Sequence, residues 1–325
     1  MALKDLFTRA SRLGWRWYIV LTAILVVLGI VLPDFYVRLI TEMMIMALFA
    51  MSVNLLLGYT GMVTFGHAAY FGVGVYSCAL LVDKLNVSIN IIFPVSFFIA
   101  AIMASFVGLV FGFFAIRARG IYFALLTMAF GQLIWAILYQ WYDFTGGDTG
   151  ISKIYPPEGF LRSAEGYYFF TLIMVGLCFF AIYRIDRSPF GWALRAIREN
   201  PTRTEFVGIR VKRYRLVVFV LSTFFAGIAG ALFVYFLRYA HPHHAGFMKA
   251  GEPLLACLVG GMFNFFGPAL GAAVMMFLDW LTNRFTEYWP LVMGIVLVLI
   301  VLFFPMGIGG FLSERFNRIM GSERE

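Results

Sequence analysis

The chain has 325 residues, of which 62% are apolar and only 13% are charged. Soluble domains usually carry about 45–50% apolar and about 25% charged residues. The composition therefore excludes an ordinary globular enzyme, a disordered chain and a disulfide-stapled secreted module. Because a transmembrane helix needs about 20 apolar residues, it predicts an all-α multi-pass membrane protein with about eight to ten crossings.

The basic residues are concentrated in two segments. The chain has 25 Lys and Arg against 17 Asp and Glu, a formal net charge of +8, and most of the excess lies in residues 1–16 and 184–215. Basic residues that flank membrane spans stay in the cytoplasm, so both segments are expected on that side. Nucleic-acid binding is disfavoured, because these residues flank apolar runs.

Taken in chain order, the apolar runs cover residues 17–33, 38–57, 62–82, 89–116, 120–140, 167–183, 215–238, 253–263, 266–284 and 287–305. The first run is longer than a signal-peptide core, and Pro33-Asp34-Phe35 stands where a small-residue cleavage site would be, which predicts an uncleaved span. Residues 1–16 are expected to form a cytoplasmic segment, 17–305 the membrane domain and 306–325 a cytoplasmic tail. This orientation puts the Arg117/Arg119 link inside and the acidic loop 141–166 outside.

Two of the runs are weak as membrane spans. Residues 62–82 are rich in glycine, and 253–263 are too short to cross alone, so broken or re-entrant segments are expected there. The stretches 61–66 and 261–267 also resemble each other, with one inserted residue. Paired Gly-interrupted segments in two halves of a chain favour a substrate path, while close helix packing through small residues is the alternative. The predicted path residues are Asn54, Thr60, Gly61, Thr64, Gly66, His67, Tyr70, Gly261, Asn264 and Gly267.

The sequence holds no arrangement typical of catalysis or of a bound cofactor. It contains no phosphate-binding glycine loop with lysine, no nucleophile–histidine pair and no metal-ligand spacing. Cys78, Cys178 and Cys257 lie in separate apolar runs and are interpreted as small buried hydrophobes. The cluster 241–244 (His-Pro-His-His) is interpreted as an outer loop, with metal binding as the alternative.

Few ionisable residues fall inside the apolar runs, and this scarcity disfavours ion-coupled transport. Glu42 and Asp279 lie near the ends of their runs, where a helix-end or snorkelling position is favoured. His67 follows the first glycine-rich break and is interpreted as hydrogen-bonded structure, with a place on a polar path as the alternative.

The basic loop 184–215 is predicted to form two short helices, one over 189–200 and one over Thr202–Val207 that ends at Gly208. Such an amphipathic pair either lies on anionic lipid or docks into a groove of a soluble partner. In the second case Trp192 and Ile197 would be its apolar anchors. Composition leaves both options open.

Several short motifs are spread along the chain, over residues 54–69 (NLLLGYTGMVTFGHAA), 119–124 (RGIYFA), 145–151 (TGGDTGI), 191–200, 207–209, 222–232, 260–261 and 303–307. With these stretches, in family order, the chain resembles the M-type permease of the branched-chain amino-acid (leucine/isoleucine/valine) ABC importers. Together the stretches span about 20–310, nearly the whole chain.

The resemblance implies a transport subunit of the bacterial cytoplasmic (inner) membrane that is not itself an enzyme. Its expected partners are a second homologous permease, two ATPase subunits that hold ATP-Mg, an extracytoplasmic solute-binding protein and the lipid bilayer. The ATPase-coupling motif of the family falls on Glu205 and Gly208, flanked here by Thr204 and Phe206 where relatives more often have Ala. The expected coupling residues are Trp192, Arg195, Arg198, Glu199, Glu205 and Gly208.

Three functions are compared. The first is an ABC importer permease for branched-chain or related amino acids, with urea or short amides as alternative solutes within the same family. The second is an ion-coupled secondary transporter, which the scarcity of ionisable residues in the spans disfavours. The third is a non-transport membrane subunit, such as a haem-bearing oxidoreductase, for which His67 is the one candidate ligand in the spans.

Overall fold

The computed structural model describes residues 16–85, 88–284, 289–303 and 307–310, so the expectations for residues 1–15 and for most of the 306–325 tail lie outside the described residues. The helices are α2 (Arg16–Val31), α3 (Asp34–Thr60), α4 (His67–Lys84), α5 (Ile89–Ala115), α6 (Ile121–Gln140), α7 (Tyr142–Thr145), α8 (Ala164–Asp186), α9 (Pro189–Glu199), α10 (Pro201–Phe206), α11 (Val211–Leu237), α12 (Phe247–Gly260), α13 (Gly267–Asn283) and α14 (Trp289–Phe303). Short 3₁₀ turns η1 (Gly147–Thr149), η2 (Phe160–Arg162) and η3 (Pro242–Ala245) lie in the connections. Each of the ten predicted apolar runs overlaps one of these helices, and the runs 62–82 and 253–263 also extend into a non-helical segment.

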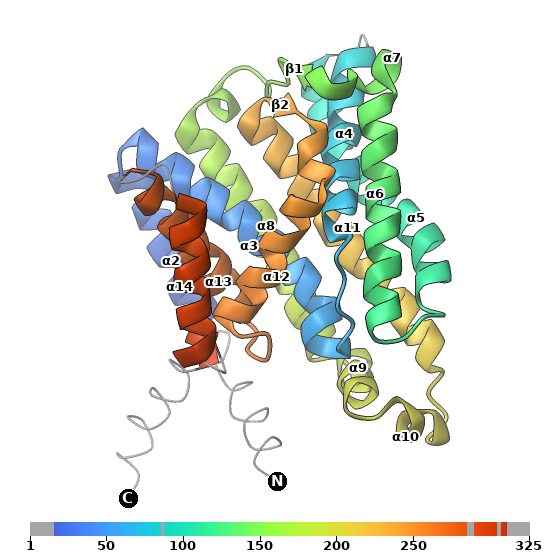
Figure 1. The fold of residues 1–325 in the computed structure, drawn as a ribbon. Coiled ribbons are helices and arrows are strands. Elements are labelled where there is room, and N and C mark those ends of the chain that lie inside the picture. The colour runs from blue at the N-terminus through green and yellow to red at the C-terminus, as the bar shows by residue number, and fades with distance from the viewer. Residues whose placement is uncertain (1–15, 86–87, 285–288, 304–306, 311–325) are drawn as a thin grey trace, which may run out of the picture.

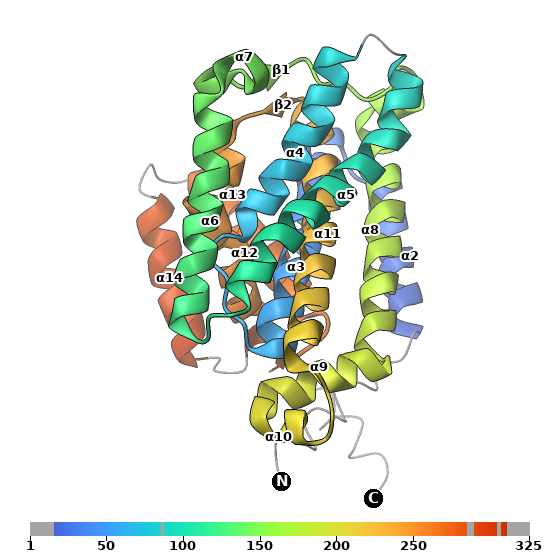
Figure 2. The same ribbon diagram turned by 90° about the vertical axis from the view of Figure 1, so that its right-hand side faces the viewer.

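The bundle has two distinct ends. Figure 1 shows α7 and the strands at its upper end and the short helices α9 and α10 at its lower end. The link between α5 and α6 lies at the lower end too, together with α9 and α10 (Figure 2). The connection that holds α7 therefore lies opposite the basic segment 184–215, as the parity of the apolar runs predicts.

Helices α3 and α11 form the core. In the most apolar 18-residue stretch of each of these two helices, 78% is buried inside the protein. The corresponding share is 33% in α5 and in α6 and 39% in α8. Helix α11 packs against α3, α4 and α5, and these neighbours surround it in both views (Figures 1 and 2). A helix that is apolar all round and buried within its own bundle is typical of the interior of a membrane domain.

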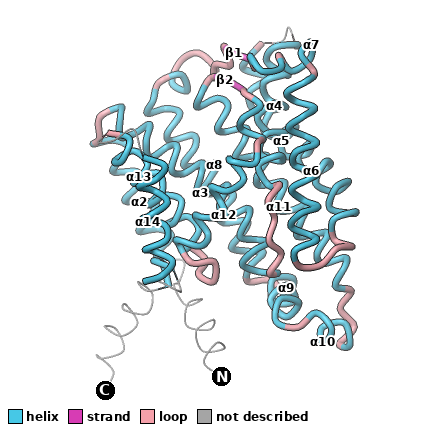
Figure 3. The backbone as a smooth tube through the Cα atoms, viewed as in Figure 1, coloured by secondary structure: helices cyan, strands magenta, loops and turns pink. Residues whose placement is uncertain are grey.

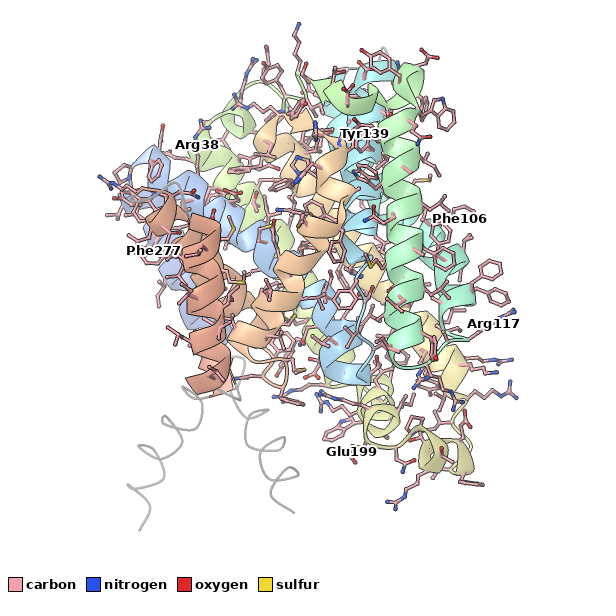
Figure 4. The ribbon with its side chains drawn as sticks, in the orientation of Figure 1. Arg38, Phe106, Arg117, Tyr139, Glu199 and Phe277 are labelled. Carbon is pink, nitrogen blue, oxygen red and sulfur yellow. The ribbon has the colours of Figure 1, made fainter. Side chains whose placement is uncertain are left out.

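The outer helices carry apolar side chains toward the surroundings. On α5, Phe98, Ile102 and Phe106 are each more than half exposed and recur every fourth residue. Figure 4 shows Phe106 and Phe277 pointing outward on opposite flanks, while Arg117 and Glu199 lie toward the lower end. An apolar belt between charged ends is what a bilayer selects, and five helices of the described part are long and apolar enough to cross it. The chain is a multi-pass membrane protein.

Both weak runs contain a break in the helical backbone. Helix α3 ends at Gly61, whose φ of +69° is left-handed, and α4 begins only at His67. Helix α12 likewise ends at Gly261, with φ of +96°, and α13 begins at Gly267. The backbone is therefore non-helical at 61–66 and 261–266, while re-entry into the membrane and a role in a substrate path stay predictions.

The structure also contains a feature that the sequence did not predict. Strands β1 (Ile151–Ser152) and β2 (Tyr239–Ala240) form a short antiparallel pair in which Ile151 faces Ala240 (Figure 3). Two residues are too few to give a recognisable strand pattern. The pair ties together the two connections at the upper end of the bundle.

Close helix packing depends on glycine at the centre of the bundle. A Cβ added at Gly74 of α4 would lie 2.3 Å from the carbonyl oxygen of Gly227 on α11, and one at Gly108 of α5 would lie 2.2 Å from Oγ1 of Thr223. Lipid tails are as apolar as leucine, so association of helices in a bilayer depends on packing of this kind.

This packing predicts that Gly74→Val destabilises the bundle, because a β-branched side chain must separate two backbones. Extra side-chain atoms in a packed core destabilise a protein by roughly 1–3 kcal/mol where neighbouring side chains can move aside. The neighbour of Gly74 is the backbone of α11, which can move less than a side chain. The control is Gly176→Val on α8, where an added Cβ meets nothing within 4 Å. Thermal unfolding in mild detergent should show a lower midpoint for Gly74→Val alone; equal midpoints for the two variants would contradict the packing argument.

Candidate functional site: the loop helices, the helix breaks and a basic cavity

The basic segment forms two capped helices. Ser188 caps α9 by accepting a hydrogen bond from the Gly191 amide at 3.2 Å, and Asn200 caps α10 by accepting from the Arg203 amide at 3.0 Å. A proline occupies the first turn of each helix, where its missing N–H costs nothing. The predicted helix pair is confirmed, with bounds within two residues of those expected.

One face of α9 packs onto the bundle. Leu194 and Ile197 are completely buried, whereas Trp192 is 56% exposed. Ile197 therefore is not an exposed anchor for a partner, and that part of the prediction is wrong. The sequence argument did not select Phe206 and Val207, which are 87% and 81% exposed at the end of α10.

Arg195 and Arg198 point from α9 back toward the bundle. Arg195 forms an ion pair with the buried Asp186, and its guanidinium lies 5.0 Å from the ring centre of Trp192. Arg195 thus ties α9 to the end of α8. Of the other predicted coupling residues, Glu199, Glu205 and Gly208 are exposed, and Gly208 has a left-handed φ of +92°.

Arg198 joins the two helix breaks. Its guanidinium donates a hydrogen bond to the carbonyl of Gly58, in the last turn of α3. It also lies 3.8 Å from the sulfur of Met262 and 4.2 Å from the ring centre of Phe263, both in the break between α12 and α13. Burial lowers the pKa of Arg198 from its ordinary value. A cation at the C-terminal end of α3 is favourable, because the carbonyls there carry the negative end of the helix dipole.

The first break borders a cavity of about 400 Å³. Its lining residues are Thr60, Gly61, Met62, Val63, Phe65, Ala118, Arg119, Gly120, Ile121, Phe123, Ala124 and Arg215. Of the predicted path residues, Thr60 and Gly61 line this cavity. The sequence argument did not select Arg119 and Arg215, which lie far apart in the chain.

His67 lies in the interior, completely buried. Its Nε2 is 3.2 Å from the hydroxyls of Ser52 on α3 and Ser222 on α11. Both hydroxyls donate to backbone carbonyls, those of Phe49 and Ser52, so Nε2 of the imidazole carries the proton. Nε2 of His67 is thus hydrogen-bonded, as the favoured interpretation of the sequence expects, whereas Nδ1 has no partner among the described residues; a place on a polar path stays a prediction.

The other predicted path residues fall into two groups. Near His67, Asn54 and Thr64 are buried, and Asn54 Oδ1 and Thr64 Oγ1 have no hydrogen-bond partner among the described residues; Tyr70 packs against Phe219, with ring centres 5.6 Å apart. The second group, Gly66, Gly261, Asn264 and Gly267, serves close contacts. A Cβ at Gly66 would lie 1.9 Å from the Thr127 carbonyl oxygen, one at Gly267 2.0 Å from that of Gly261, and Asn264 donates to the Gly309 carbonyl at 3.0 Å.

The structure gathers ionisable residues that the sequence argument treated separately. Lys249 and Glu252 of α12 form an ion pair at 2.7 Å, and Lys249 is 9% exposed. Glu42 of α3 and Asp279 of α13 both interact electrostatically with this pair. Glu42 and Asp279 therefore belong to a four-residue cluster between three helices and are not isolated helix-end charges.

The histidine cluster 241–244 lies in the turn η3, as expected for a loop. His244 packs edge-on against Phe233, with ring centres 5.1 Å apart. No group of three or more His, Cys, Asp or Glu side chains that could hold a metal ion occurs in the part of the chain that the structure describes.

The fold and this site define a multi-pass α-helical membrane protein with a charged helix pair outside its spans. Comparison with known proteins gives the family: the family model "Branched-chain amino acid transport system / permease component" matches residues 35–301. The chain belongs to this family of permeases. It is 30% identical to the high-affinity branched-chain amino acid transport system permease protein LivM of Escherichia coli K12, over 82% of this chain and 68% of that protein.

Two further relatives match with lower identity or over a shorter part of the chain. The permease LivH of Salmonella typhimurium LT2 is 25% identical over 81% of this chain and 91% of its own length. The guanosine ABC transporter permease NupQ of Bacillus subtilis 168 is 29% identical over 33% of each chain. A solved chain described as an inward-facing metal-chelate-type ABC transporter covers 90% of this chain and is itself fully covered, with a TM-score of 0.49 and 14% identity.

His244, in the turn η3, predicts that the stability of the folded chain depends on pH. Burial first, and then the charge of Lys249, lowers the pKa of His244 to about 3, against 6.5 for an ordinary histidine. Between these values the unfolded chain binds the proton and the folded chain does not. Stability is therefore complete above about pH 6.5 and falls as the pH drops toward 3.

In His244→Gln this loss should shrink, while Gln at the exposed His243 should leave it unchanged. Unfolding midpoints in detergent from pH 7.5 down to pH 4.5 test the difference. Parallel curves for wild type and His244→Gln would contradict the assignment.

Proposed function

We propose that this chain forms half of the translocation path of an ATP-driven importer for branched-chain or related amino acids. A second, LivH-like permease would form the other half, two ATPase subunits would bind ATP-Mg, and an extracytoplasmic protein would deliver the solute. The chain itself would bind no cofactor. Membership of the permease family supports the proposal, and the contacts of Arg198 are the structural observation that carries the coupling step.

The proposed orientation places the end with α9 and α10 in the cytoplasm, with both termini on that side of a bacterial inner membrane. The support is electrostatic: the basic segment 184–215 and the Arg117/Arg119 link lie at the same end. The domain limits follow, with 1–16 and 306–325 as cytoplasmic extensions of the membrane domain 17–305.

The surface proposed for ATPase docking is the end of the helix pair. Trp192, Phe206 and Val207 are exposed apolar side chains beside the exposed charges of Glu199 and Glu205. Apolar anchors on a short helix, rimmed by charge, suit a groove of a partner protein. Anionic lipid is the alternative support, because the segment 184–215 is basic overall and a bilayer surface attracts cations.

In the proposed coupling step Arg198 transmits movement of α9 to the spans. A shift of α9 would pull on the end of α3 through Gly58 and on the break between α12 and α13 through Phe263. Left-handed glycines at both breaks absorb changes in backbone angle, because glycine lacks the Cβ that restricts them. Alternating access would then be movement of the segments around these breaks.

The proposed solute is a branched-chain amino acid, because LivM relatives match most of the chain. Urea or a short amide remains the alternative, and the guanosine permease among the relatives marks how far solutes differ across similar chains. An ion-coupled mechanism would use the cluster around Lys249. Uptake that fails when ATP is depleted but persists without a membrane potential separates the two mechanisms.

The coupling step predicts that Arg198→Gln lowers ATP-driven uptake at least about tenfold, because a charge-assisted hydrogen bond is worth roughly 1.5–3 kcal/mol. The matched control is Arg203→Gln on α10, where the side chain is exposed. Uptake is measured in vesicles that contain the intact complex. Equal uptake by both variants would contradict a coupling role, provided that ATPase subunits copurify with each.

The docking surface makes a separate prediction. Phe206→Asp should release the ATPase subunits, since it puts an unpaired charge into an apolar contact, yet it should leave the permease folded because the side chain is 87% exposed. Asp in place of the exposed Phe160, in the turn η2 between α7 and α8 and outside the spans, is the control for added charge. Copurification measures whether the ATPase subunits stay bound, and the unfolding midpoint shows whether the permease is still folded. If Phe206→Asp retains the ATPase subunits, the docking surface lies elsewhere.

A further inference from the structure

The cavity at the first break contains two arginines without a described acidic partner at salt-bridge distance. Arg119, in the link between α5 and α6, is exposed, and Arg215, in the second turn of α11, is half-buried. Neither forms a salt bridge with any residue that the structure describes. The Nε of Arg215 is buried and has no hydrogen-bond partner there.

The positive charges of Arg119 and Arg215 are not balanced by a described acidic residue at salt-bridge distance. Arg119 and Arg215 repel each other, and the carboxylate that attracts Arg215 is the exposed Glu205 of α10. An anion between the two guanidinium groups would relieve this repulsion. Guanidinium groups bind phosphate and carboxylate through paired N–H donors, so an oxyanion fits this position.

The rest of the wall is apolar. Phe65, Ile121 and Phe123 line the cavity, and Ile121 is 69% exposed. The neighbouring Tyr122 is 73% exposed, so the cavity borders the outer surface of this chain at the start of α6. A space of about 400 Å³ with cations at one side and apolar walls at the other suits a group that is itself part charged and part apolar.

We propose that Arg119 and Arg215 form an oxyanion site that holds the phosphate of an anionic phospholipid at the proposed cytoplasmic end of the bundle. Basic pockets between transmembrane helices on this side of a membrane suit such headgroups. The site would tie the α5–α6 link to the start of α11, which directly follows the loop helices. A bound phosphodiester would supply the missing acceptor for Nε of Arg215.

Free inorganic phosphate has the same chemistry, and the experiment separates the two sources. The full-length chain is purified in mild detergent and titrated with phosphatidylglycerol or with phosphatidylcholine of the same acyl chains, and bound lipid is counted by native mass spectrometry. Wild type should prefer phosphatidylglycerol. Each neighbouring basic residue contributes roughly fivefold, so Arg119→Gln/Arg215→Gln should lose roughly 25-fold of this preference.

The matched control is Arg117→Gln, two residues from Arg119. Arg117 points outward (Figure 4), lies 4.6 Å from the ring centre of Phe113 and does not line the cavity. The Arg117→Gln variant should keep the full preference for phosphatidylglycerol. Arg119→Lys/Arg215→Lys, which retains both charges, should keep most of it and guards against a folding defect in the glutamine variant.

The outcomes are separable. A preference lost only with the two cavity arginines supports the lipid site, and displacement of the lipid by inorganic phosphate at equal concentration supports the oxyanion chemistry with a soluble source. A preference that survives in the double glutamine variant overturns the proposal. So does displacement by leucine but not by phosphate, because the cavity would then hold the carboxylate of a transported solute.

Discussion

Close approach of helix backbones in a medium without water is the constraint on which this structure depends. Between apolar helices in lipid there is no hydrophobic force, so the helices associate by contact. Gly74 and Gly227 allow α4 and α11 to touch along their backbones, and Gly108 allows α5 to meet Thr223. The central helices thereby become a compact core, and the movable elements lie at its ends.

The two helix breaks depend on that core. Residues 61–66 and 261–266 leave the helical backbone after α3 and α12, and some of their amides keep a local partner: that of Met62 donates to the Leu56 carbonyl and that of Asn264 to the Gly261 carbonyl. Arg198 reaches both breaks from a helix outside the spans. One side chain thus connects the surface proposed to dock a partner with the two segments proposed to move. The proposed mechanism needs no catalytic chemistry from this chain, only a rigid core and a linked pair of hinges.

Charge has different roles at different depths. At the end with α9 and α10 charge is abundant, and there it supports the proposed orientation and supplies the arginine pair of the cavity. Within the bundle charge is rare and is gathered in one cluster, where Lys249 pairs with Glu252. Nε2 of the buried His67 lies 3.2 Å from the hydroxyls of Ser52 and Ser222.

By itself the sequence determined the membrane class, the apolar runs that become helices, the two glycine-rich interruptions and the loop helices, because each of these follows from local patterns of apolar residues, glycines and caps. The family followed from a resemblance of short motifs along the chain. Only the tertiary structure decided which residues meet. It buried Ile197, exposed Phe206, joined β1 to β2 and brought Arg119 beside Arg215. In a uniformly apolar helix no periodicity tells which face meets protein and which meets lipid, and contacts between distant segments depend on that choice.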